Sequence, residues 1–169
     1  DAKHVVDESD RRSTFANWLT SQENQYFAEV QVNRLWATLM GRGLVEPVDD
    51  LRSTNPATNP KLLKALAEDF RNSGYDQKHI LKTIALSRVY SHQSQTTPSN
   101  ASDRVNYSRH YRHRVRAEVL SDAIADFTET SPVMQAMPPE SRANQVWTTR
   151  VDSVFLVTFG RPKENQDPP

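Results

Sequence analysis

The sequence predicts an all-α fold, an irregular bundle of about five to six helices joined by long ordered loops. Apolar residues recur at helical spacing along most of the chain, whereas the alternation of apolar and polar residues that indicates a strand is scarce. Helix-capping residues precede most of these segments, and Gly or Pro follows them. The hydrophobic fraction of 36% is low for a compact domain, which predicts a modest core with much polar loop around it.

The first two helices are expected on either side of residue 20. The first covers about residues 11–20, with Asp10 as its N-cap, and should dock through Trp18. The second follows Asn24 as its N-cap and stops before Gly41 and Gly43. Because apolar side chains occupy two sides of this second helix, we expect it to be central in the bundle.

Two further helices are expected after an irregular loop over residues 41–59. The third begins with Asn59 as N-cap and Pro60 at the first helical position, and it ends at Gly74. The fourth follows Asp76 after a short connection, so the two helices should be antiparallel neighbours. Their predicted inward-facing residues are Leu62, Leu63, Leu66, Ala67, Phe70, Ile80, Leu81 and Ile84.

The remaining third of the chain is predicted to be more irregular. Residues 91–108 should form a surface loop, and a fifth helix is expected over about 112–129. Its inward face is predicted to contain Val119, Leu120, Ala123 and Phe127. We expect a single helical domain over 1–169, with its core over about 11–129. Residues 130–169 should form an extended C-terminal segment with one short helix over about 152–159, cut short at its end.

The composition excludes several classes of function. Lys plus Arg and Asp plus Glu number 21 each, so no overall charge attracts nucleic acid or an anionic membrane. No apolar stretch is long enough to span a bilayer. The absence of Cys excludes disulfides, thiolate catalysis and covalent haem attachment. We therefore expect no cofactor, no nucleic-acid partner and no membrane insertion of this segment.

Two clusters of charged residues are candidates for chemistry. Glu46, Asp49 and Asp50 lie in the loop after the second helix, and hydrolysis of a glycosidic bond needs two carboxylates in different protonation states. The alternative is that these acids cap turns and pair with Arg.

The second cluster is the run SRHYRHRVR over residues 108–116. Its guanidinium groups could bind phosphate, carboxylate or an acidic sugar. They belong to Arg109, Arg112, Arg114 and Arg116. The alternative is a charged helix start, in which these Arg residues pair with acids a turn or more later. His110 and His113 are three residues apart, but no third ligand is near, so we expect no metal site.

The middle of the second helix contains three residues with an expected architectural role, Asn33, Arg34 and Trp36. We expect Trp36 to pack in the core and Arg34 to be buried. A buried guanidinium needs partners, so Arg34 should bond Asp49, Asp50 or backbone carbonyls of residues 44–52, with Asn33 satisfying further backbone groups.

Several long segments resemble one known family. FANWLTSQENQYFAEVQVNRLWATLMGRGLVEPVDDLR, NPKLLKALAEDF, GYDQKHILKTIALSRVY and RAEVLSDAI resemble, in this order, the planctomycete domain of unknown function 1553. The resemblance implies that this chain is the C-terminal part of a large exported protein. Such proteins often also contain a cytochrome-c-like domain. The resemblance also implies an extracytoplasmic or periplasmic location, and no activity that transfers residue by residue.

Three functions follow as hypotheses. The first is a non-catalytic helical module that packs against sibling domains of a large exported protein and positions them. The second is part of an enzyme acting on a polysaccharide or its acidic sugars, through the acidic loop and the Arg-rich run. The third is a docking module for a cytochrome-c-like domain.

Overall fold

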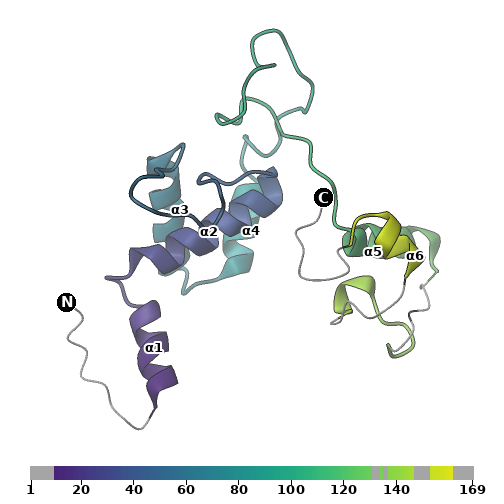
Figure 1. Ribbon diagram of the computed structural model, residues 1–169, viewed down its shortest axis with the longest axis horizontal. Helices are drawn as coiled ribbons and strands as arrows, with labels where there is room; N and C mark the ends of the chain where they lie inside the picture. The colour runs from purple at the N-terminus through teal and green to yellow at the C-terminus, as the bar shows by residue number, and fades with distance from the viewer. Residues whose placement is uncertain (1–9, 131–133, 135–136, 147–152, 162–169) are drawn as a thin grey trace. The chain divides into compact units, whose positions relative to one another are not determined.

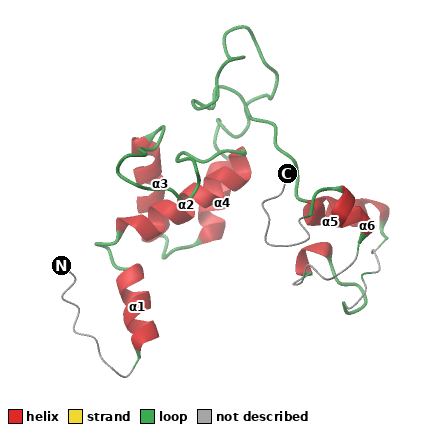
Figure 2. Cartoon of the chain, in the orientation of Figure 1, coloured by secondary structure: helices red, strands yellow, loops and turns green. Residues whose placement is uncertain are grey.

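The computed structural model describes residues 10–130, 134, 137–146 and 153–161 of the chain. These residues form six α-helices and one short 3-10 helix, and no strand occurs among them (Figures 1 and 2). The predicted all-α class is therefore confirmed. The chain divides into two compact units, residues 1–112 and 113–169, and each has its own hydrophobic cluster. The expectation of a single domain stays a prediction.

The first unit contains four helices, α1 (Arg11–Leu19), α2 (Gln25–Met40), α3 (Pro60–Asn72) and α4 (Gln77–Ala85). The predicted caps hold them, because the side chains of Asp10, Asn24, Asn59 and Asp76 each accept hydrogen bonds from backbone N–H groups of the first turn. Helix α2 packs on both α3 and α4, which also pack on each other. Its predicted central position is confirmed.

The core of the first unit lies between these three helices and receives one residue from a distant segment. Trp36 of α2 is buried, and its ring meets that of Tyr107 edge-on with centroids 5.3 Å apart. Tyr107 is only 5% exposed, although residues 91–108 were expected to form a surface loop. The segment is irregular as predicted, yet it contributes a core residue, because the Tyr107 ring packs against the indole of Trp36.

Helix α1 does not dock as expected. None of its residues is buried, and Trp18 is 43% exposed and packs beside Phe15, with ring centroids 5.8 Å apart. The prediction that α1 docks through Trp18 is wrong. Three large apolar side chains in nine residues make too narrow a face to outweigh the polar residues around them. The Tyr75 hydroxyl donates a hydrogen bond of 2.8 Å to the Thr20 carbonyl at the end of this helix.

The second unit contains α5 (Ala117–Thr128), the 3-10 helix η1 (Ala143–Gln145) and α6 (Val154–Thr158). Helix α5 packs on η1 and α6 with the face opposite to the predicted one. Its buried residues are Ala117, Ser121 and Asp122, whereas Phe127 is 90% exposed. The Asp122 carboxylate accepts the N–H groups of Ala143 at 2.6 Å and Asn144 at 3.2 Å. This anchor fixes the rotation of α5.

The second hydrophobic cluster contains Ala117 of α5 together with Met134, Ala143 and Leu156. The expected core over about 11–129 stays a prediction. Helix α5 begins at Ala117 rather than near the predicted residue 112, because Arg116 has the extended ψ of 141°.

None of the helices in the described ranges is both long and apolar enough to cross a bilayer.

Candidate functional site: an arginine-lined pocket

The pocket begins where α2 ends in a sharp turn. Gly41 adopts a left-handed conformation with φ of 74°, and its N–H donates to the Ala37 carbonyl at 2.8 Å. Two residues later, a Cβ on Gly43 would lie 2.5 Å from the carbonyl oxygen of Val45, so only Gly fits there. The turn holds Arg42 between these two glycines.

Asn33 holds the loop after this turn against α2. Its side chain is fully buried, and its Nδ2 donates to the carbonyl oxygens of Val45 at 3.0 Å and Val48 at 2.7 Å. Its Oδ1 accepts the N–H of Val45 at 3.0 Å. These are the backbone contacts expected for Asn33. The Glu46 carboxylate accepts the Gly43 N–H, so the loop is also fastened to itself.

Arg34 makes the predicted contact but is not buried. Its Nε and Nη2 donate to the two carboxylate oxygens of Asp49 at 2.7 and 3.0 Å. The Arg34 and Asp49 side chains are 55% and 61% exposed, so the predicted burial of Arg34 is wrong. The buried face of α2 contains Val32, Asn33 and Trp36, which leaves Arg34 at the edge facing solvent. Hydrogen bonding from Arg34 lowers the pKa of Asp49.

The two aspartates of the acidic loop are each engaged by an arginine. Asp50 accepts bidentate hydrogen bonds from Arg52 at 2.6 and 2.7 Å, and this contact lowers the pKa of Asp50. Asp49 is likewise paired with Arg34. Both carboxylates are thus kept ionised, whereas a glycosidase needs one that is protonated near neutral pH. Glu46 is the candidate acid that lines the pocket.

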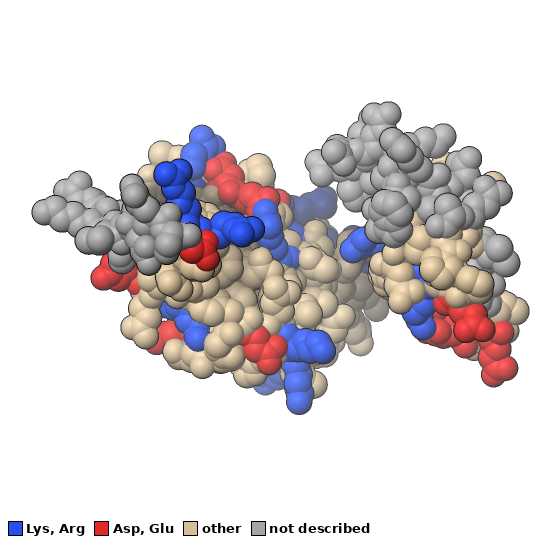
Figure 3. Space-filling model, turned by 90° about the horizontal axis from the view of Figure 1, so that it is seen from below, with Lys and Arg blue, Asp and Glu red and all other residues tan. Residues whose placement is uncertain are grey.

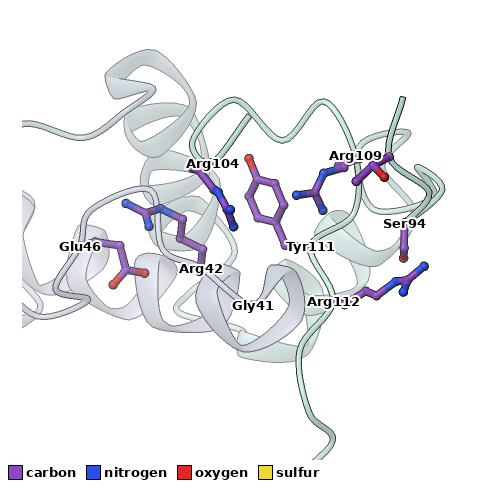
Figure 4. A pocket seen from close by; sticks show the side chains of 9 residues that line it. Gly41, Arg42, Glu46, Ser94, Arg104, Arg109, Tyr111 and Arg112 are labelled. Atoms are coloured by element: carbon purple, nitrogen blue, oxygen red, sulfur yellow. The ribbon is translucent and has the colours of Figure 1, made fainter. Parts of the chain in front are cut away.

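A pocket of about 480 Å³ lies between the end of α2 and two parts of the irregular segment that follows α4 (Figure 4). Four arginines line it, Arg42, Arg104, Arg109 and Arg112. Glu46, Tyr111 and the hydroxyl residues Ser94 and Thr96 also line it. The positive side chains therefore come from regions about sixty residues apart in the chain, and folding brings them to one cavity.

The wall of the pocket is built by Asp103 and Tyr107. The Asp103 carboxylate accepts the Ser108 hydroxyl and the N–H groups of Val105, Asn106 and Ser108. Hydrogen bonding from Ser108 and Asn106 holds the pKa of Asp103 far below its usual range. This cluster closes the turn that carries Arg104.

Tyr107 joins that wall to the end of α2. Its hydroxyl donates to the Gly43 carbonyl at 2.7 Å and also lies 3.1 Å from the Arg42 carbonyl. Its N–H donates to the Tyr111 hydroxyl oxygen at 3.0 Å. Burial raises the pKa of Tyr107 to about 12, so its hydroxyl stays protonated and continues to donate. The two halves of the pocket are therefore fastened together.

The pocket is strongly positive. Within the described part of the chain, none of its four arginines forms an ion pair. The Nε atoms of Arg42 and Arg109 are buried and have no hydrogen-bond partner. The Arg109 guanidinium lies 5.2 Å from the centroid of the Tyr111 ring, which holds it in place. Such groups can bind carboxylate, sulfate or phosphate through paired N–H donors.

One face of the molecule is mixed in charge. On the face shown in Figure 3, Lys and Arg side chains are interspersed with Asp and Glu. The four arginines that line the pocket are, by contrast, without an ion pair in the described part of the chain. A pocket lined by charges of one sign concentrates the electrostatic field, whereas charges of opposite sign on a mixed surface largely cancel.

The sequence-predicted candidates separate into two groups. Arg109, Arg112 and Glu46 line the pocket together, whereas Arg114 and Arg116 do not. Arg116 Nε instead lies 3.9 Å from Glu118 Oε2, two residues along the chain, which is closer in sequence than the pairing a turn or more later that was expected. His110 packs edge-on against Tyr90 with ring centroids 5.4 Å apart. No group of three potential metal ligands occurs among the residues whose positions are described.

Sequence reasoning missed Arg42 and Arg104. Arg42 lies between two glycines directly after a helix, where a sharp turn is expected. Arg104 follows Asp103 in a polar segment with no periodicity. No local pattern connects either residue to the other or to Arg109.

The chain was compared with protein families, curated proteins and solved structures. The family model described as "Protein of unknown function (DUF1553)", also designated PSD1, matches residues 11–167. No curated protein and no solved structure matches the chain. The match covers both compact units and includes the Arg-lined pocket. The chain therefore belongs to the DUF1553 family.

Proposed function

We propose that the first unit is a non-catalytic binding module that holds an anionic ligand in the arginine-lined pocket. The observation that carries this proposal is the meeting of four arginines from separate segments at one cavity with a single carboxylate. Like charges repel, so gathering them costs free energy that a bound anion offsets. The pocket volume of about 480 Å³ is in the range of small-molecule sites.

The contacts of the other polar groups support binding rather than catalysis. The Glu46 carboxylate accepts the Gly43 N–H, and the Tyr111 hydroxyl accepts the Tyr107 N–H. Both groups therefore serve to fasten the loops. Asp49 and Asp50 are held ionised by their own arginines. The enzyme hypothesis, which needed these carboxylates as acid and base, is consequently less well supported.

The test measures anion binding at low ionic strength by isothermal titration calorimetry. The wild-type chain should bind at least one of inorganic phosphate, sulfate and acetate, and affinity should fall as NaCl is added. The double variant Arg109→Gln, Arg112→Gln should weaken binding by about tenfold or more, since each charge-assisted contact contributes more than about 1 kcal/mol.

The matched control removes two arginines elsewhere on the same unit. Arg11 and Arg12 are exposed on α1 and do not line the pocket, so Arg11→Gln, Arg12→Gln should leave the affinity unchanged. If both double variants bind alike, or if the wild-type chain binds none of the three anions, the proposed function is wrong.

A second role, the positioning of sibling domains, is supported by a different observation. Helices α5 and α6, with the residue that follows α6, expose apolar side chains at Val119, Phe127, Val154, Val157 and Phe159. Exposed apolar residues of this kind favour contact with another protein surface. We propose that these side chains pack against neighbouring domains of a larger exported polypeptide. A cytochrome-c-like domain, the third hypothesis from the sequence, would use the same side chains.

This second role predicts a difference between the chain and its parent. Phe127→Ser with Val119→Ser should leave the melting temperature of the chain within about 2 °C of wild type, because both side chains are exposed. In a parent protein with its sibling domains, the same change should accelerate limited proteolysis between domains. Unchanged proteolysis of the parent would contradict the packing role.

A further inference from the structure

The arginines of the pocket do not converge on one point. In Figure 4 the Tyr111 ring lies between Arg104 and Arg109, with Arg42 on the α2 side and Arg112 beside Ser94. Arg109 is fixed on its side of the ring by packing on Tyr111, at 5.2 Å from the ring centroid. A single small anion cannot lie against all four guanidinium groups when an aromatic ring divides them.

Each side of this division has its own unsatisfied donor. The Nε of Arg42 and the Nε of Arg109 are both buried without a hydrogen-bond partner. A buried N–H without an acceptor costs about 1–3 kcal/mol, and more when the group is charged. Because these Nε atoms are buried, a ligand in the pocket meets the outer N–H groups of Arg42 and Arg109, which line it from different segments of the chain.

The rest of the lining is polar. Ser94 and Thr96 line the pocket, and no large aliphatic side chain is among its lining residues. Glu46 adds one carboxylate near the Arg42 side, as Figure 4 shows, and this lowers the positive potential there. The Arg109 and Arg112 side should therefore bind an anion more tightly than the Arg42 and Arg104 side.

From these observations we infer that the pocket recognises a small polar molecule carrying two anionic groups, one bound by Arg109 and Arg112 and the other by Arg42 and Arg104. This inference rests on the proposed function and names its ligand class. Carboxylate, sulfonate or sulfate, and phosphate groups share the required chemistry, since each accepts paired N–H donors from a guanidinium group. Joining two such groups in one molecule makes the second contact intramolecular, which raises affinity without new protein groups.

The experiment compares one-headed with two-headed anions by titration calorimetry at low salt. Three matched pairs distinguish the acidic groups: acetate with glutarate, methanesulfonate with 1,3-propanedisulfonate, and methyl phosphate with pyrophosphate. For at least one pair, the two-headed anion should bind about tenfold tighter or better. The pair with the largest ratio identifies the acidic group.

Two variants separate the two sides. Arg104 is exposed, so Arg104→Gln should fold normally; it should abolish the advantage of the two-headed anion and leave the affinity for the one-headed anion unchanged. Arg109→Gln should weaken both anions. Arg12→Gln is the control and should change neither. Circular dichroism of each variant checks that it is folded.

The possible failures are distinguishable. Equal affinity for the one-headed and two-headed members of all three pairs, with loss of both in Arg109→Gln, would overturn the two-anion inference and leave the anion-binding function intact. The same conclusion would follow if Arg104→Gln kept the full advantage of the two-headed anion. Absence of binding by all six probes to the wild-type chain would overturn both proposals.

Discussion

Two adjacent residues of α2, Asn33 and Arg34, should differ sharply in their contribution to stability. Both hold the loop over residues 44–52, and both do so through the side chain. They differ in exposure, because Asn33 is fully buried while more than half of the Arg34 side chain is exposed. We predict that Asn33→Ala costs several times more stability than Arg34→Ala.

The magnitudes follow from the contacts. Asn33 makes three hydrogen bonds to backbone groups, and each contributes about 1 kcal/mol net. Its loss also leaves the buried N–H of Val45 without an acceptor, so Asn33→Ala should cost about 3–5 kcal/mol. The Arg34–Asp49 pair is bidentate but exposed, and exposed ion pairs contribute about 0.2–1 kcal/mol. Arg34→Ala should therefore cost no more than that.

Urea denaturation followed by circular dichroism measures both values. The midpoint of the first unit's transition should fall strongly for Asn33→Ala and barely for Arg34→Ala, with the m-value unchanged. Added NaCl should reduce the small Arg34 effect, because salt screens an exposed pair, and should leave the Asn33 effect unaltered. Equal costs for the two variants, or a loss below about 1 kcal/mol for Asn33→Ala, would refute the assignment of the loop's anchor.

Three other predictions test the turn, the pocket wall and the second unit. A Cβ at Gly43 would meet a backbone oxygen at 2.5 Å, so Gly43→Ala should lower stability more than Gly74→Ala, which meets nothing within 4 Å and costs only left-handed strain of about 1 kcal/mol; urea midpoints that reverse this order would contradict it. The pKa of Asp103 is lowered in the folded state, so its contribution is complete above its ordinary pKa of 3.8 and is lost only as pH falls towards the folded pKa. The amide shifts of the pocket wall should accordingly titrate with a midpoint below 3.8 in NMR, and a midpoint at or above it would refute the Asp103 anchor. Leu156→Ala should destabilise the second unit by about 2–5 kcal/mol, whereas Phe127→Ser should change it by less than about 0.5 kcal/mol; comparable losses in thermal melts would show that the face of α5 is misassigned.

The charge distribution explains why the site was only partly visible in the sequence. The chain has equal numbers of acidic and basic residues, which argues against binding to a polyanion over a broad surface. Several acids are already neutralised, however, because Asp49, Asp50 and Asp126 each form an ion pair with an arginine outside the pocket. Their pairing leaves the pocket arginines unpaired. A chain with a net charge of zero can therefore contain a strongly positive cavity.

Helices α2, α3 and α4 could be predicted from the sequence because their determinants are local. Asn24, Asn59 and Asp76 bond N–H groups within the next three residues, and each apolar stripe is set by residues one turn apart. The contact between Arg34 and Asp49 was also predictable, since the loop that carries Asp49 must return from the end of the same helix. The exposure of the Arg34 side chain was not predictable, because burial depends on which other segments pack beside that side chain.

Tertiary contacts decided the orientation of α5, the burial of Tyr107 and the composition of the pocket. The apolar stripe of α5 predicted the wrong face, because the bonds from Asp122 to the backbone of Ala143 and Asn144 bury the polar side instead. The pocket joins Arg42 to Arg104 and Arg109 across about sixty residues of sequence, through a Tyr107 hydroxyl that reaches the Gly43 carbonyl. The sequence by itself determined where α2, α3 and α4 begin and end, since capping and periodicity act within a few residues. Which charges share a cavity was decided only in the folded chain, because long-range packing brings those segments together.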